Sequence, residues 1–170
     1  IAGGHGGNVS LSTCILFGPR AQALLPCQPM RQAREGHQSI LLADGTVLVA
    51  CGVPANASGS ECELYDPASN SWSDVLGATR RTRAAVTLLP SGQVLIAGGL
   101  SYTGASLASM ELFDSRSRSI TPVGPPLAAP RSEHRAVSIP GVDALIVGGL
   151  DGAGAATATV EKVLYGPQPN

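Results

Sequence analysis

The sequence has few charged and few aromatic residues. Charged residues make up 14% and aromatic residues 4% of the 170 positions, and the formal net charge is −1. So few charges do not suit the solvated faces of a helical bundle. A nearly neutral chain has no global field to attract nucleic acid or an anionic membrane, and scarce aromatics offer no stacking platform for bases. We therefore expect no nucleic-acid partner.

Long apolar runs are also missing. The longest, such as residues 46–50 and 94–97, have the length of a strand, whereas a spanning helix needs roughly 18 apolar residues. We expect no membrane span. In contrast, 21 glycines and 13 prolines interrupt the chain too often for long helices, while a hydrophobic content of 44% can fill a core. The composition predicts an all-β domain.

Three landmarks recur with a period near 50 residues. Short apolar runs end at Gly4, Gly52, Gly99 and Gly149, at intervals of 48, 47 and 50 residues. Each is followed after 13 to 16 residues by an aromatic, at Phe17, Tyr65, Phe113 and Tyr165. Arginines precede the next apolar strand at Arg34, in residues 80–83 and at Arg131. Such self-similarity is typical of repeat architectures.

Each period predicts four short strands. In the second period they are residues 37–42, a hairpin turn at Asp44 and Gly45, residues 46–50, residues 63–65, and a strand with Trp72. Short strands without intervening helices predict antiparallel sheets. The predicted repeats are 1–29, which lacks its first strand, 30–77, 78–126, and 127–170, which lacks its fourth.

The double glycine, the arginine before the first strand, and Tyr65 followed seven residues later by Trp72 resemble the kelch motif. The resemblance covers nearly the whole chain and implies a β-propeller of four-stranded antiparallel blades, of which this chain holds about three and a half. The remaining blades are expected from the same longer chain or a partner subunit. Cys51 departs from the motif by replacing one glycine, and Ile120 by replacing the tryptophan.

Four cysteines lie in the first two repeats. The repeat register places Cys14 near Cys27, and Cys51 near Cys62, as hairpin neighbours. Neighbours at this spacing satisfy the Cα separation of about 4.4–6.8 Å that a disulfide needs. We therefore predict the disulfides Cys14–Cys27 and Cys51–Cys62, and with them an extracellular, cell-surface or periplasmic location. Buried thiols are the alternative, and zinc is disfavoured because no C-x-x-C pair is present.

Two N-x-S sequences, at Asn8 and Asn56, fall in loops after a second strand. They are candidate glycosylation sites in a secreted eukaryotic protein.

Seven of the ten arginines lie at junctions between a fourth strand and the next first strand: Arg31, Arg34, Arg80, Arg81, Arg83, Arg131 and Arg135. The kelch resemblance implies that these junctions meet on one face around a central channel. Since the guanidinium fork binds carboxylate or phosphate well, we predict a ligand-binding face formed by Arg34, His37, Arg80, Arg83, Arg131 and His134. The alternative is structural: repeated arginines that hold loop carbonyls or pair with an acid in the next blade, for which Glu35, Glu63, Glu111 and Glu133 are the candidates.

No catalytic constellation is found. Asp44, Asp66 and Asp114 are interpreted as turn formers, and no nucleophile elbow occurs. Two of the three tyrosines take the repeated aromatic position, which argues against a copper site like that of galactose oxidase. We expect no cofactor, and predict a non-catalytic binding or scaffolding propeller that recognises a protein or glycan. The alternatives are the propeller of a secreted carbohydrate-acting enzyme with catalytic residues outside this segment, and an intracellular adaptor.

Overall fold

The computed structural model describes residues 1–18, 22–54 and 60–164. These residues form antiparallel strands joined by turns and contain no helix, so the prediction of an all-β protein is confirmed. None of the described segments is a helix long and apolar enough to cross a membrane. The chain divides into two compact units, Ile1–Thr79 and Arg80–Asn170, which are described separately below.

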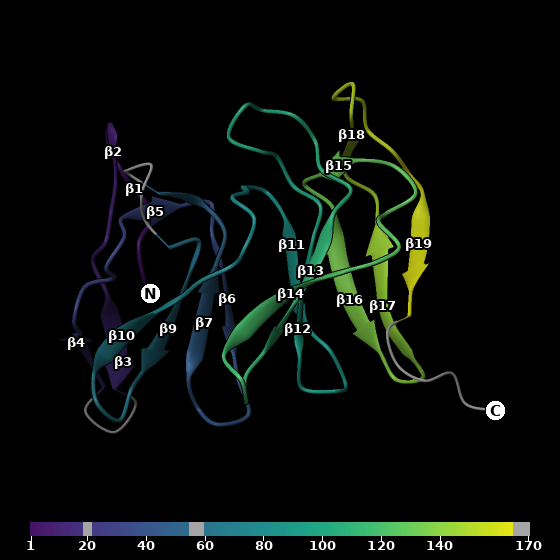
Figure 1. Cartoon of the computed structure of the whole chain (residues 1–170). Helices are drawn as coiled ribbons and strands as arrows, with labels where there is room; N and C mark the ends of the chain where they lie inside the picture. Colours follow the sequence, from purple (N-terminus) through teal and green to yellow (C-terminus); the bar gives the residue numbers. More distant parts are fainter. Residues whose placement is uncertain (19–21, 55–59, 165–170) are drawn as a thin grey trace. The chain divides into compact units, whose positions relative to one another are not determined.

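Unit 1 contains a four-stranded sheet in the order β10-β9-β7-β6 (Figure 1). Its strands are β6 (Gln38–Leu41), β7 (Val47–Ala50), β9 (Cys62–Asp66) and β10 (Ser71–Val75). Three two-stranded ladders accompany it: β1 (His5–Gly6) with β2 (Val9–Ser10), β3 (Ile15–Gly18) with β4 (Ala23–Pro26), and β5 (Arg34–Glu35) with β8 (Val53–Pro54).

Unit 2 contains a second four-stranded sheet in the order β11-β12-β13-β14. Its strands are β11 (Ala85–Leu88), β12 (Val94–Ala97), β13 (Met110–Asp114) and β14 (Ser119–Val123). A three-stranded sheet follows, formed by β16 (Arg135–Ile139), β17 (Val142–Val147) and β19 (Val160–Val163). A short ladder pairs β15 (Arg131–Ser132) with β18 (Leu150–Asp151).

Aspartates shape the turns between strands, as the sequence predicts. Asp44 Oδ1 accepts hydrogen bonds from the backbone N–H and hydroxyl of Thr46, at 3.0 and 2.7 Å. Asp66 and Asp114 each accept a backbone N–H from two residues later in the chain, at 2.9 and 2.8 Å. A carboxylate that accepts nearby backbone donors stabilises a tight turn without help from the rest of the fold. These three aspartates therefore act as turn formers.

Strand register corrects one of the repeat landmarks. Second and third strands are paired so that Val47 faces Tyr65, Val94 faces Phe113 and Ala144 faces Val163. Val163, which is buried, thus takes the repeated aromatic position that the sequence pattern assigns to Tyr165. The physical reason is that cross-strand pairing and burial set the register, and valine fills the position equally well. Tyr165 itself lies outside the described residues.

The core of unit 1 joins the first repeat to the four-stranded sheet. Tyr65 and Trp72 pack with ring centroids 4.9 Å apart, in one cluster with Cys14 and with the partly buried Leu16. The Trp72 indole N–H donates to the carbonyl of Gln28 at 2.7 Å. The aromatic pair therefore anchors residues from two successive predicted repeats.

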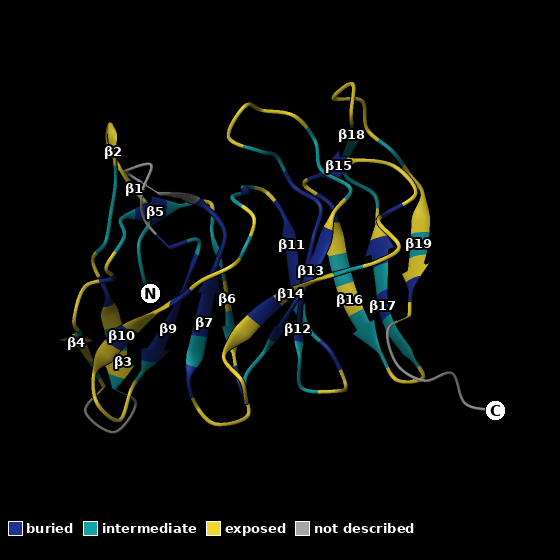
Figure 2. Ribbon diagram, viewed as in Figure 1, coloured by how far each residue is buried: buried dark blue, intermediate teal, exposed yellow. Residues whose placement is uncertain are grey.

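The core of unit 2 lies between its two larger sheets. The cluster contains Leu95, Ala97, Met110 and Leu112 from one sheet and Ala144, Ile146 and Val163 from the other. Figure 2 shows the burial concentrated in the middle strands, such as β12 and β13. Face-to-face packing of successive antiparallel sheets thus buries the apolar residues of this unit.

Of the two predicted disulfides, the structure shows Cys14–Cys27, with a Cα–Cα distance of 5.3 Å. Cys51 and Cys62 are both buried, where β7 ends and β9 begins. The Cys51 N–H donates to the carbonyl of Glu61 at 3.1 Å, so these chain segments run side by side. The pairing of Cys51 with Cys62 stays a prediction.

Replacing both Cys14 and Cys27 with serine should lower the free energy of unfolding by about 2–3 kcal/mol, the effect of releasing a loop of this length. Urea unfolding of the oxidised protein and the double variant measures the loss. Wild-type protein unfolded under dithiothreitol is the matched control and should lose at least as much, because dithiothreitol also reduces the predicted Cys51–Cys62 disulfide. Reduction without any change in the unfolding midpoint would contradict the prediction.

Candidate functional site

The side chain of Arg34 is completely buried. Its guanidinium donates hydrogen bonds to the carbonyls of Cys51, Glu61 and Ser60, at 2.9, 3.0 and 2.9 Å. It also forms an ion pair with Glu63 at 2.7 Å. Arg34 thus binds four residues that lie 17 to 29 positions later in the sequence, so it has a structural role.

Glu63 binds more than one partner. Its carboxylate also accepts the backbone N–H groups of Arg31 and Gln32, at 2.7 and 3.1 Å. The segment before β5 is therefore attached to β9 through this single side chain. A buried carboxylate is tolerated only when it is paired and hydrogen-bonded in this way.

The same arrangement recurs in unit 2. Arg81 is buried and pairs with Glu111 at 3.2 Å, and it donates to the carbonyl of Gly98 at 3.0 Å. Arg131 is buried and faces Glu161 at 3.7 Å. These three buried pairs agree with the structural alternative in linking arginine to glutamate, but they correct the expected partner. In each pair, the glutamate lies on the third strand of the same predicted repeat and not in the next blade, because the buried arginine faces its own sheet.

Arg81, not the predicted Arg80, is therefore the counterpart of Arg34 and Arg131. Two adjacent arginines fit the sequence pattern, and only the tertiary structure decides which of them enters the interior. Arg80 is half-buried and Arg81 fully buried. Sequence analysis also misses Glu161, although its distance of 50 residues from Glu111 was a usable signal.

The other predicted acids lie nearer the surface. Glu133 forms an exposed ion pair with Arg83, and the Glu35 carboxylate makes a hydrogen bond with His5 Nδ1 near the surface. Exposed pairs of this kind contribute little to stability because solvent screens them. Glu63 and Glu111 thus serve the buried network, whereas Glu35 and Glu133 form surface pairs.

Both histidines of the predicted ligand face have altered titration. Burial, assisted by the Arg131 guanidinium, lowers the pKa of His134 to about 4. Burial, assisted by Arg34, also lowers the pKa of His37. Loss of hydration disfavours the charged imidazolium, and a neighbouring cation acts in the same direction. Both rings are therefore neutral near pH 7.

The six residues of the predicted ligand face divide by burial. Arg34, Arg131 and His134 are buried, His37 and Arg80 are half-buried, and Arg83 is exposed. Arg34 and Arg131 contact the protein's own backbone and acids and do not present their charges to solvent. Arg34 and His37 belong to unit 1 and the other four to unit 2. Of the set, Arg83 is the residue best placed to reach a ligand.

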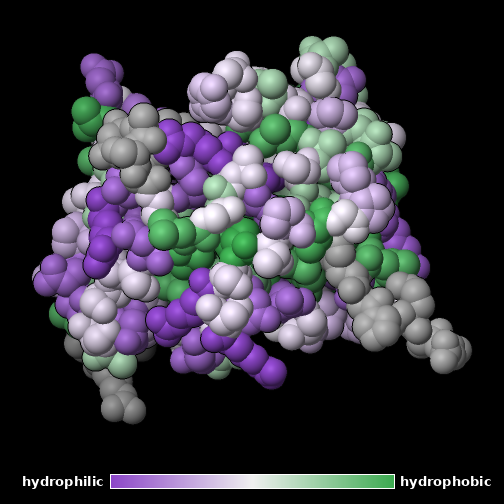
Figure 3. Space-filling model, in the orientation of Figure 1, coloured by the Kyte–Doolittle hydropathy of each residue, from purple (hydrophilic) through white to green (hydrophobic). Residues whose placement is uncertain are grey.

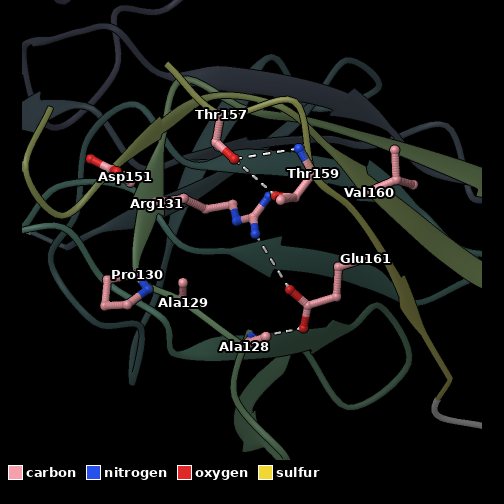
Figure 4. A pocket seen from close by; sticks show the side chains of 9 residues that line it. All are labelled: Ala128, Ala129, Pro130, Arg131, Asp151, Thr157, Thr159, Val160 and Glu161. Carbon is pink, nitrogen blue, oxygen red and sulfur yellow. Dashed lines mark hydrogen bonds and ion pairs between the residues drawn. The ribbon is translucent and has the colours of Figure 1, made fainter. Parts of the chain in front are cut away.

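A pocket of about 340 Å³ lies in unit 2 beside Arg131. Figure 4 shows the Arg131 guanidinium and the Glu161 carboxylate pointing toward each other, with Thr157 and Thr159 nearby. Glu161 also accepts the backbone N–H of Ala128 at 2.8 Å. The charged groups of this pocket thus already interact with the protein itself.

Of the two candidate glycosylation sites, Asn8 is exposed in the turn between β1 and β2, and Asn56 lies outside the described residues. Within the described part of the chain, no group of three or more His, Cys, Asp or Glu side chains is arranged to hold a metal ion. No protein-family model matches the chain. No curated protein matches it either.

Proposed function

We propose that this chain is a segment of a kelch-type β-propeller that acts as a non-catalytic binding or scaffolding module outside the cytosol. The proposal rests on one observation, which is that the recurring arginines bind other parts of the protein. The arginines Arg34, Arg81 and Arg131 are all buried and each is paired with a glutamate. These repeated ion pairs stabilise the β-sheets. Recognition of a ligand is therefore assigned to the loops that differ between repeats.

Two loops of unit 2 have the same backbone frame and different side chains. In one, the Ser101 N–H donates to the Ala105 carbonyl at 2.8 Å; in the other, the Asp151 N–H donates to the Ala155 carbonyl at 2.9 Å. The first loop presents Tyr102, which is 83% exposed, where the second has Gly152. Variable side chains on a constant frame are typical of a recognition surface.

Arg83 is placed close to this tyrosine loop along the backbone. The adjacent residue, Thr82, exchanges two backbone hydrogen bonds with Leu100, at 2.9 and 2.7 Å. The loop that holds Tyr102 is therefore attached next to the exposed Arg83. Tyrosine and arginine are the side chains most often found at the energetic centres of binding surfaces.

The last sheet supports a scaffolding role. In the register, Val147 and Val160 correspond to Ala97 and Met110, which are buried against the next sheet. Val160 is 60% exposed, and Figure 3 shows apolar surface over β19. The sheet of β16, β17 and β19 thus offers the same kind of face that its neighbour buries. We propose that this apolar face is covered by another sheet of the same repeat type.

Binding is tested on an immobilised panel of neutral and acidic glycans together with a polyglutamate peptide. We expect at least one of these probes to bind, and Tyr102→Ala and Arg83→Ala each to weaken that binding by about tenfold or more. Arg116→Ala, which removes an exposed arginine from the turn between β13 and β14, is the matched control and should bind normally. No binding to any probe, or equal affinity of all three variants, would contradict the proposal.

A further inference from the structure

The imidazole of His134 packs against Gly98 of the preceding predicted repeat, and the His134 Cβ packs against Gly149 of its own repeat. A Cβ atom added to Gly98 would lie 2.6 Å from His134 Cε1, and one added to Gly149 would lie 2.8 Å from the His134 Cβ. Both distances are too short for any side chain at these glycines. His134 is only 1% exposed. The ring is therefore enclosed where the two repeats meet.

Backbone hydrogen bonds surround this ring. The Gly99 N–H donates to the carbonyl of Arg131 at 2.8 Å, and the Arg131 N–H donates to the carbonyl of Leu107 at 3.0 Å. The Glu133 N–H donates to the carbonyl of Arg83 at 3.0 Å. All three bonds join residues of repeat 78–126 to residues of repeat 127–170. Their geometry depends on the packing that His134 completes.

Unit 1 contains the same motif. A Cβ atom on Gly3 would lie 2.9 Å from His37 Cε1, and the Gly4 N–H donates to the carbonyl of Arg34 at 2.9 Å. At the corresponding position of the repeat between them, the chain has Ala84. The repeat can therefore form without a histidine at this position. The fold itself does not require the imidazole of His134.

The charged surroundings oppose protonation of His134. The Arg131 guanidinium acts on the ring from β15, and the glycine segments on either side contribute no charge. For His37, Arg34 disfavours the protonated ring and Glu63 partly compensates. Protonated His134 would be a second cation beside Arg131 in a buried site, which is unfavourable.

We propose that His134 is a pH-sensitive clasp that holds repeats 78–126 and 127–170 together when neutral and releases them when protonated. The pKa of about 4 in the closed structure is below the ordinary value of 6.5 that the ring regains on opening. The closed state is thus fully stable above pH 6.5 and loses stability as the pH falls toward 4. Mild acid therefore shifts the equilibrium of this junction toward the open state.

The test is hydrogen exchange of the Gly99 amide in the full chain, corrected for the intrinsic pH dependence of exchange. Between pH 7 and pH 5 its protection should fall on the order of 20-fold, from the two pKa values above. His134→Ala, which introduces the residue found at position 84, should abolish this pH dependence. His5→Ala, which removes an exposed histidine of unit 1, is the matched control and should preserve it.

An unchanged protection of Gly99 in the wild type, or an equal fall in His134→Ala, would overturn the proposal. Should His134→Ala fail to fold, NMR titration of the wild-type ring decides. A His134 midpoint well below 6.5 that accompanies the loss of Gly99 protection supports the clasp. An ordinary midpoint near 6.5 with constant protection contradicts it.

Discussion

Replacing Arg34 with methionine is expected to lower the free energy of unfolding by about 3–5 kcal/mol. The loss arises because Glu63 would remain buried as an uncompensated charge, while three backbone carbonyls would lose their donor. Losses of this size approach the total stability of many domains. Urea unfolding, or thermal unfolding if the variant is too unstable at room temperature, measures the effect.

Arg83→Met is the matched control, since Arg83 forms its ion pair with Glu133 at the exposed surface. Its cost should stay below about 1 kcal/mol because solvent screens the pair. Combining Arg34→Met with Glu63→Leu should recover part of the loss, because the combination removes the stranded charge. If Arg34→Met and Arg83→Met lower the free energy of unfolding equally, burial of the Arg34–Glu63 pair does not add to its contribution to stability.

Gly99→Ala is expected to be the second most damaging substitution, with a loss of about 2–4 kcal/mol. Gly99 has a φ of +98°, which L-residues rarely adopt, and its added Cβ would lie 2.5 Å from the carbonyl oxygen of Thr82. Strain and collision therefore act together. The measurement is the same urea unfolding experiment.

Gly104 offers a control that separates these two causes. Its φ is +82°, yet a Cβ added there meets nothing within 4 Å. Gly104→Ala should cost only the backbone strain, about 1–2 kcal/mol. If Gly99→Ala costs no more free energy of unfolding than Gly104→Ala, the close approach of Gly99 to Thr82 within repeat 78–126 does not require glycine.

The buried arginine–glutamate pairs and the His134 junction depend on different protonation states. The ion pairs of Arg34 and Arg81 need ionised glutamates, whereas His134 needs to remain neutral. Protonation of His134 would place a second cation beside Arg131, so we expect the junction to lose stability as the pH falls below 6.5.

The sequence by itself determined the features that depend on local chemistry. Glycines, prolines and short apolar runs predicted an all-β chain, and the repeat spacing predicted four-stranded antiparallel sheets. Asp44 and Asp66 were identifiable as turn formers because an aspartate bonds its own nearby backbone. Cys14 and Cys27 were identifiable as a pair because strand neighbours in a hairpin have little choice of partner.

Only the tertiary structure decided which side chains are buried and what they contact. Arg80 and Arg81 are adjacent residues of the same type, so the sequence alone does not distinguish them. In the structure, Arg81 faces the interior and pairs with Glu111. Val163 replaces the expected aromatic because register follows cross-strand pairing. Arg34 and His134 were expected to meet a ligand and are instead enclosed by the fold. Burial depends on the packing of distant segments, and no local pattern of residues contains that information.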